Sequence, residues 1–178
     1  ALVQRAVLEQ TDASVLAETV TVAADAAVTV WRGASHDDTR RSLLWSNIES
    51  LISKGTELLV RNFCHPLLFQ YVQGLGDYGL YGKAASLAGA LAETASGQLG
   101  GEHADTLQLR LAAMYWTGMT GAHEQAEAMA SALLRDAVSA LGNGHELTLL
   151  CKLYAIRWSI EDSSELSAVD RYSELVAE

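Results

Sequence analysis

The sequence contains very little proline, cysteine or positive charge. Its 178 residues include one proline, Pro66, and two cysteines, Cys64 and Cys151. Two cysteines do not make a disulfide framework, so we expect a reduced, cytoplasmic protein. Apolar residues, chiefly Ala and Leu, make up 49% of the chain, which is enough for a sizeable core. With so little proline, this composition favours helices over strands.

Basic residues are outnumbered by acidic ones. The chain has 12 Lys and Arg against 22 Asp and Glu, a formal net charge of −10. Residues 66–178 alone carry six Lys and Arg and fourteen Asp and Glu, a net charge of −8. An acidic surface repels phosphate backbones, so we expect no nucleic-acid partner.

The sequence lacks an evident leader or membrane anchor. No basic stretch followed by an apolar run stands at the start, so no signal peptide is expected. Residues 15–31 are the most apolar early stretch, but they contain Glu18 and Asp25. We expect this stretch to be too short and too interrupted to cross a bilayer, and hence no membrane partner. Because the chain begins at Ala1 rather than Met, we expect it to be a piece of a longer protein.

The sequence repeats itself at an offset of 42 residues. Residues 99–107, LGGEHADTL, recur as residues 141–149, LGNGHELTL, with five of the nine residues identical. Other pairs at the same offset are Gly79 and Gly121, Ala84 and Ala126, Ala88 and Ala130, and Trp116 and Trp158. A period of this length is typical of arrays in which each repeat is one small structural unit.

Each repeat predicts two helices. Apolar residues at three- and four-residue steps predict helices over residues 106–117 and 122–141, with glycines in the turn between them. The other copies predict helix pairs at 66–78 with 81–99 and at 146–160 with 164–176. Upstream, the pattern predicts helices at 12–31 and 37–63, joined by a loop at 32–36. The expected fold is therefore all-α, with a helical linker region at 1–63 and repeats at 64–178 (about 66–99, 106–141 and 147–176).

The ends and contacts of these helices can also be predicted. Gly142 follows a helix where a left-handed C-cap is expected, and Asp105 or Thr106 is expected as an N-cap. The recurring alanines, Ala84 and Ala88 in one copy and Ala126 and Ala130 in the next, should let two helix backbones approach closely.

The repeated motif resembles a known family. A glycine, an aromatic residue and a small residue, followed by Leu-Gly-x-x-His-x-x-Thr-Leu, is similar to the 42-residue tetratricopeptide repeats of the kinesin light chain type. The motif runs here from Gly79 to Leu107 and from Gly121 to Leu149, and the resemblance covers about residues 66–178. It implies a right-handed superhelix of antiparallel helix pairs, with the N-terminal helices packed on it.

The sequence departs from that family at several positions. Proline usually follows the histidine, but Ala104 and Glu146 stand there. The third copy has Ser163 where glycine is expected and Glu165 where an aromatic residue is expected.

Similar repeats occur in bacterial regulators, where they follow an NB-ARC nucleotide-binding switch. Residues 2–9, LVQRAVLE, resemble the segment that closes the winged-helix part of such switches, and the helices after it resemble the linker of actinobacterial members. No strand-loop phosphate motif is present, so the switch itself would lie outside this chain. The resemblance therefore implies a sensor or regulatory module of an NB-ARC-type NTPase or transcriptional regulator.

The resemblance also implies a protein or peptide partner on the inner face, which the first helix of each repeat lines. The family register places five residues there: Gln70, Gln73, Arg110, Thr117 and Lys152. Arg110 and Lys152 would form a positive strip for a partner carboxylate. Alternatively, both cations pair with nearby acids of the chain, for example Lys152 with Glu146.

A second hypothesis is a helical dimerisation domain without a peptide ligand. The expected last helix, 164–176, carries an apolar stripe of Leu166, Val169, Tyr172 and Val176. A repeat array normally covers such a stripe with a further repeat or a polar cap. We therefore expect weak homodimerisation through this helix.

A nucleotide-binding enzyme is a distant alternative. Residues 74–79, GLGDYG, match the dinucleotide fingerprint, follow the apolar run 67–72 and precede a helix, with Glu93 at the distance of a ribose-binding acid. That fingerprint needs a βαβ unit, which the helical pattern does not provide. No nucleophile motif is recognisable either. We expect no enzyme activity, no catalytic residues and no cofactor.

The histidines, cysteines and tryptophans have structural interpretations. Cys64 and His65 are adjacent and cannot face one metal from a regular helix. His103 and His145 fall on successive repeats, where each is expected to bond a backbone group, so no metal site is expected. The tryptophans lie on apolar faces that favour the core, with Trp116 and Trp158 near the helix ends that open onto the groove.

Overall fold

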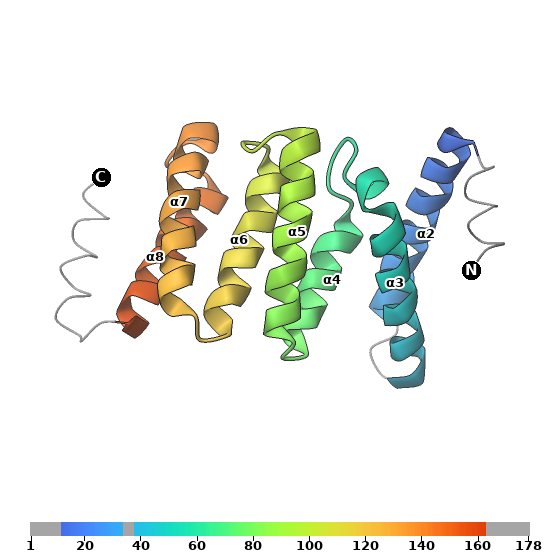
Figure 1. Ribbon diagram of the computed structural model, residues 1–178, viewed down its shortest axis with the longest axis horizontal. Helices are drawn as coiled ribbons and strands as arrows, with labels where there is room; N and C mark the ends of the chain where they lie inside the picture. Colours follow the sequence, from blue (N-terminus) through green and yellow to red (C-terminus); the bar gives the residue numbers. More distant parts are fainter. Residues whose placement is uncertain (1–11, 34–37, 163–178) are drawn as a thin grey trace. The chain divides into compact units, whose positions relative to one another are not determined.

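The computed structural model describes residues 12–33 and 38–162, and its regular structure is helical throughout (Figure 1). Within these residues there are seven helices and no strand, which confirms the all-α expectation. The helices are α2 Ala13–Gly33, α3 Asp38–Leu59, α4 Pro66–Asp77, α5 Tyr81–Leu99, α6 Ala104–Met119, α7 His123–Leu141 and α8 Glu146–Asp162.

The chain forms two compact units, residues 1–71 and 72–178, and the boundary between them falls within α4. In the first unit α2 packs against α3. In the second unit each helix from α5 to α8 packs against the next, and α6 also contacts α8. Figure 1 shows α5 and α7 on one side of this second unit and α6 and α8 on the other.

The helix boundaries in the repeated part follow the sequence prediction closely. α5 has the predicted ends, and α4, α6, α7 and α8 each end within two residues of theirs. The predicted loop at 32–36 is wrong at its start, because Arg32 and Gly33 belong to α2. Residues 34–37, the predicted helix at 164–176 and the segment 2–9 lie outside the described residues.

The prediction that a helix runs to residue 63 is wrong, because α3 ends at Leu59. Pro66 begins α4, and a residue that precedes proline is disfavoured in helical conformation. The chain therefore turns before Pro66, and the N–H of His65 donates to the carbonyl of Leu59 at 2.8 Å. Val60 and Cys64, which lie within this turn, are buried.

The recurring alanines are buried, as predicted. Ala84, Ala88, Ala126 and Ala130 are all 0% exposed. Ala126 and Ala130 of α7 form one cluster with Met114 of α6 and with residues of α8. Side chains of this size let helices approach, so larger residues would separate α7 from its neighbours.

Four glycines in turns have positive φ angles, and they form two pairs at the 42-residue offset. Gly79 and Gly121 have φ of 75° and 91° and end the turns before α5 and α7. Gly100 and Gly142 have φ of 100° and 83° and follow α5 and α7. The predicted positive φ at Gly142 is confirmed, but its ψ of 166° is not the left-handed helical value. Only glycine adopts this combination without strain.

Aromatic side chains gather in the first unit. Trp31 of α2 stacks on Trp45 of α3 with ring centroids 5.8 Å apart. The ring of Tyr71 meets both indoles edge-on, at 6.3 and 5.5 Å. Burial raises the pKa of Tyr71, and the negative charge of Glu49 adds to this effect.

Helix α2 is unusually apolar for an element with so little burial. In the described part of the chain, it is the one helix that by length and composition could cross a membrane, over Ala13–Trp31, and little of it is buried. The expectation that this stretch is too short and too interrupted to cross a bilayer is therefore wrong by length and composition. A single such helix is weak evidence for a membrane span, because core helices of soluble proteins and signal sequences have the same length and composition.

Candidate functional site

Two tryptophans are held in the same way in successive repeats. The indole of Trp116 lies against Gly76, where a Cβ atom would come within 2.0 Å of the ring. Tyr81 stacks on the same indole, with the ring planes 11° apart and the centroids 5.8 Å apart. Trp116 is 4% exposed. The indole therefore fills the space that the missing side chain of Gly76 leaves.

The second tryptophan repeats this arrangement 42 residues later. A Cβ atom at Gly118 would come within 2.4 Å of Trp158, and His123 stacks on that indole at 5.5 Å. Trp158 is 1% exposed. The core position that the apolar faces predict is therefore confirmed for Trp116 and Trp158, although both fall near helix ends, because both indoles join helices inside the second unit.

The same contacts explain the glycine-rich motif at 74–79. The helix α4 continues through Gly74 and Gly76, so the apolar run before them is helical. A dinucleotide site requires a strand at this place. Gly76 is needed for close contact with Trp116, and Gly79 for the turn that follows, so the motif has a structural explanation.

Three histidines cap the first helices of the helix pairs. His103 is the N-cap of α6, and its Nδ1 accepts a hydrogen bond from the N–H of Asp105 at 3.2 Å. His145 accepts from Leu147 in the same way, also at 3.2 Å. The expected backbone bonds of these histidines are thus confirmed. The expected N-cap at Asp105 or Thr106 is wrong, because α6 begins earlier and both residues lie in its first turn.

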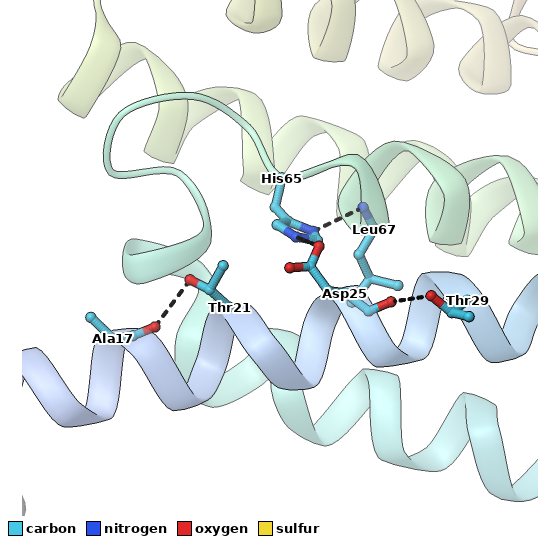
Figure 2. A network of polar contacts seen from close by, with 6 residues as sticks. All are labelled: Ala17, Thr21, Asp25, Thr29, His65 and Leu67. Atoms are coloured by element: carbon cyan, nitrogen blue, oxygen red, sulfur yellow. Dashed lines mark hydrogen bonds and ion pairs between the residues drawn. The ribbon is translucent and has the colours of Figure 1, made fainter.

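His65 does the same for α4 and makes one contact more. Its Nδ1 accepts from the N–H of Leu67 at 3.2 Å, so the proton of the neutral ring is on Nε2. Nε2 lies 3.1 Å from Oδ1 of Asp25 on α2 and can donate to it. Figure 2 shows the imidazole between the Asp25 carboxylate and the Leu67 N–H. One buried ring thus joins α2 to the start of α4.

Further polar contacts in this network stay within α2. Thr21 Oγ1 donates to the Ala17 carbonyl at 3.0 Å, and Thr29 Oγ1 donates to the Asp25 carbonyl at 2.9 Å (Figure 2). The hydroxyls of these threonines thus find hydrogen-bond acceptors within their own helix.

Among the residues that the structure describes, no group of three or more His, Cys, Asp or Glu could hold a metal ion.

The five residues predicted to bind a peptide differ in exposure, and several of them make polar contacts within their own helices. Gln70 is half-buried in α4, while Gln73 is exposed and its amide donates to Asp77 at 2.8 Å. Thr117 donates its hydroxyl to the Ala113 carbonyl at 2.8 Å. Lys152 is half-buried in α8. Their role in binding stays a prediction.

Arg110 forms an ion pair within the second unit. Its guanidinium donates to Oδ2 of Asp136 on α7 at 2.7 Å. Arg110 therefore pairs with an acid of the chain, as the alternative expected, although the acid was not foreseen. Arg110 also lies close enough to Cys151 to oppose the effect of burial, which raises the pKa of that thiol to about 11.

Arg110 lines a groove between the second helices of the two repeats. This α5–α7 groove has a volume of about 360 Å³ and a floor formed by α6. Its lining is mostly small or apolar, with one carboxylate, one hydroxyl and the guanidinium. The residues are Gly89, Ala92, Glu93, Ser96, Arg110, Ala113, Met129, Ala132 and Leu133.

A second surface lies on the other side of α6. Helical spacing places Tyr115 and Met119 opposite Arg110 and Ala113. Tyr115 contacts Tyr154 of α8 at a centroid distance of 5.1 Å, and both rings are half-buried. Burial raises the pKa of Tyr154. We call Tyr115, Met119, Tyr154 and Arg157 the first-helix face.

Arg157 completes this face. Its guanidinium carbon lies 4.7 Å from the centroid of the Trp158 ring, and Nη2 lies 3.9 Å from the sulfur of Met119. These contacts hold an exposed cation beside the two tyrosines. The sequence signal for this face was available, because Ala112, Tyr115 and Met119 follow helical steps on one side of α6.

The α5–α7 groove was missed for a different reason. Its walls come from residues about forty positions apart that share no motif, and small residues such as Gly89 and Ala132 carry no chemical signal.

Comparisons of the chain with protein-family models, with curated proteins and with solved structures gave no match.

Proposed function

We propose that this chain is a protein-interaction scaffold of the tetratricopeptide type, in which helix pairs stack into a right-handed superhelix. One observation carries the proposal, namely the duplication of the joint between helices. The Trp116 contact with Gly76 and Tyr81 recurs as the Trp158 contact with Gly118 and His123. Stacking of equal units through equal joints is the principle of repeat proteins.

The first-helix face supports a role in binding. Tyrosine, arginine and methionine are enriched where proteins bind one another, and this face combines Tyr115, Tyr154, Met119 and Arg157. The rings are half-buried against their own helices, so little side-chain freedom is lost when a partner covers them. An extended or helical peptide would lie across α6 and α8 there.

The proposed setting is a regulator. The motif resemblance places such repeats after an NB-ARC switch, so this chain would be the sensor or regulatory part of a cytoplasmic NTPase or transcriptional regulator. In that role, occupation of the first-helix face by a partner would be the signal. No reaction by the chain itself is needed.

Peptide display on the purified chain tests the scaffold. We expect the chain to select particular peptides from a random library. These peptides should bind the Tyr115→Ala and Tyr154→Ala variants about tenfold or more weakly than the parent chain. The matched control is Tyr78→Ala, which removes an exposed tyrosine outside the face. Thermal melting of each variant separates binding from stability. Absence of enriched peptides, or affinities that none of these changes alters, would contradict the proposal.

A dimerisation domain is the second candidate, because α8 exposes two leucines. Leu149 and Leu153 are 53% and 56% exposed and lie one turn apart. Light scattering at increasing concentration distinguishes the two. A tight dimer that binds no displayed peptide would favour this alternative.

A further inference from the structure

The α5–α7 groove is shaped to take side chains from another molecule. Ala92, Ala113 and Ala132 are small, and they leave a hollow between α5 and α7 above α6. Leu133 and Met129 add apolar surface to the same hollow. Its volume of about 360 Å³ is at the lower end of the range for ligand pockets, roughly 300–1,000 Å³. A few apolar side chains would fill it.

The charges at this groove favour one kind of occupant. Arg110 is already paired with Asp136, so these two charges largely offset one another. Glu93 remains as an exposed carboxylate in the wall. The described part of this unit, residues 72–162, holds five Lys and Arg against ten Asp and Glu. An acidic partner would be repelled here, and a basic one attracted.

We propose that the α5–α7 groove binds a basic amphipathic helix of a partner protein. Apolar side chains of that helix would enter the hollow over Ala113 and Ala132, and a lysine or arginine next to them would reach Glu93. A helix seated in an apolar groove uses anchors spaced three and four residues apart. This surface lies on the side of α6 opposite Tyr115, so it is a second binding surface beyond the first-helix face.

Fluorescence anisotropy with two labelled peptides tests the charge preference. One is an amphipathic peptide of leucine and lysine, about four helical turns long, and the other carries glutamate in place of every lysine. The lysine peptide should bind at least about tenfold more tightly, and its affinity should fall as salt screens the charges. Equal binding of both peptides, or no binding of either, overturns the inference.

Matched variants locate the binding. Glu93→Lys and Ala132→Trp should each weaken the lysine peptide by about tenfold or more, because one reverses the wall charge and the other fills the hollow. Glu102→Lys makes the same charge change outside the groove, and Ala128→Trp adds the same ring to an exposed position one turn earlier on α7. Both controls should change affinity less than about twofold. If Glu102→Lys weakens binding as much as Glu93→Lys, the attraction is non-specific and the inference fails.

A further variant separates this inference from the proposed function. Tyr154→Ala should leave the lysine peptide bound, since it changes only the first-helix face. Loss of binding with Tyr154→Ala, but not with Glu93→Lys, would place the peptide on the first-helix face. That result would overturn the inference about the groove and leave the proposed function standing. If Ala132→Trp lowers the melting temperature, Glu93→Lys remains as the deciding variant, because its side chain is exposed.

Discussion

Single residues decide how the helices of the second unit meet. Glycine inside a helix normally costs about 0.5–1 kcal/mol relative to alanine. Gly76 and Gly118 are nevertheless required, because each faces an indole closer than any Cβ atom could approach. We therefore expect Gly76→Ala and Gly118→Ala to lower the free energy of unfolding by about 1–3 kcal/mol each. Chemical denaturation followed by circular dichroism measures this loss.

Gly97→Ala is the matched control for these substitutions. Gly97 lies within α5, and a Cβ atom there would meet nothing within 4 Å. The same change should therefore raise the free energy of unfolding, by up to about 1 kcal/mol. A gain in stability from alanine at Gly76 or Gly118 would show that the indoles move aside and that the joint is not tight.

Cys151 gives the stability a dependence on alkaline pH. Burial raises the pKa of its thiol from 9.0 to about 11, and nearby Arg110 only partly opposes this. Between these values the unfolded chain loses the proton and the folded chain keeps it. The contribution of Cys151 is thus complete below pH 9.0 and is lost as the pH rises to about 11. This loss should be on the order of 2 kcal/mol.

Cys151→Ala isolates that contribution from the other alkaline titrations. The variant should be less stable at neutral pH, but its free energy of unfolding should fall less between pH 9 and 11 than that of the parent chain. Cys64→Ala keeps the Cys151 thiol and should retain the steeper fall. Parallel curves for the parent chain and Cys151→Ala would refute the expected shift.

At the scale of elements, the sequence predicted most of the second unit. The 42-residue repeat aligned the glycines that end the helices, so α5 has the predicted ends. Gly79 and Gly121 have the positive φ that such turn positions require. The end of α3 was harder, because its apolar steps continue past Leu59 while the restriction from Pro66 acts several residues later.

The sequence pattern did not identify the N-caps or the contacts between distant residues. The backbone bonds of His103 and His145 were expected, but histidine is not among the preferred N-cap residues, so propensity did not place the caps there. The pairing of Arg110 with Asp136 joins residues 26 positions apart on neighbouring helices. Such partners depend on how the helices pack, whereas periodicity reports only which side of each helix is apolar.

The start of α4 depends on His65, and the cap and the tie to α2 can be separated by mutation. His65→Ala removes both, and we expect it to lower the free energy of unfolding by about 1–2 kcal/mol. His65→Asn keeps an acceptor for the Leu67 N–H and loses the contact with Asp25, so it should cost less. Because the Asp25 side chain is 71% exposed, its pair with His65 should contribute no more than about 1 kcal/mol.

Asp25→Ala completes this comparison. It should resemble His65→Asn rather than His65→Ala in thermal melting. If Asp25→Ala is as damaging as His65→Ala, the tie between α2 and α4, and not the cap, is the main contribution.

For the whole chain, the proposed binding surfaces lie on opposite sides of one helix. Arg110 and Ala113 point to the α5–α7 groove, while Tyr115 and Met119 point to the first-helix face. The residues between them, Met114 and Trp116, are buried. Because the two surfaces lie on opposite sides of α6, a partner on one surface would not block the other.

Self-association of the whole chain is governed by two opposing features, its charge and its exposed leucines on α8. The net charge of −10 repels a second copy, over about 30 Å at 0.01 M salt but only about 8 Å at 0.15 M. Leu149 and Leu153 favour association, since apolar surface gains by leaving water. We therefore expect a monomer at low salt and weak dimerisation that grows with salt and protein concentration in sedimentation velocity.

Leu153→Glu should abolish this dimerisation, whereas Leu80→Glu, which adds the same charge elsewhere, should leave most of it. Because Val169 belongs to the apolar stripe predicted for residues 164–176, Val169→Glu tests whether that segment takes part. A monomer at every salt and protein concentration would show that the α8 leucines do not form a contact between copies, and the dimerisation alternative would then be excluded.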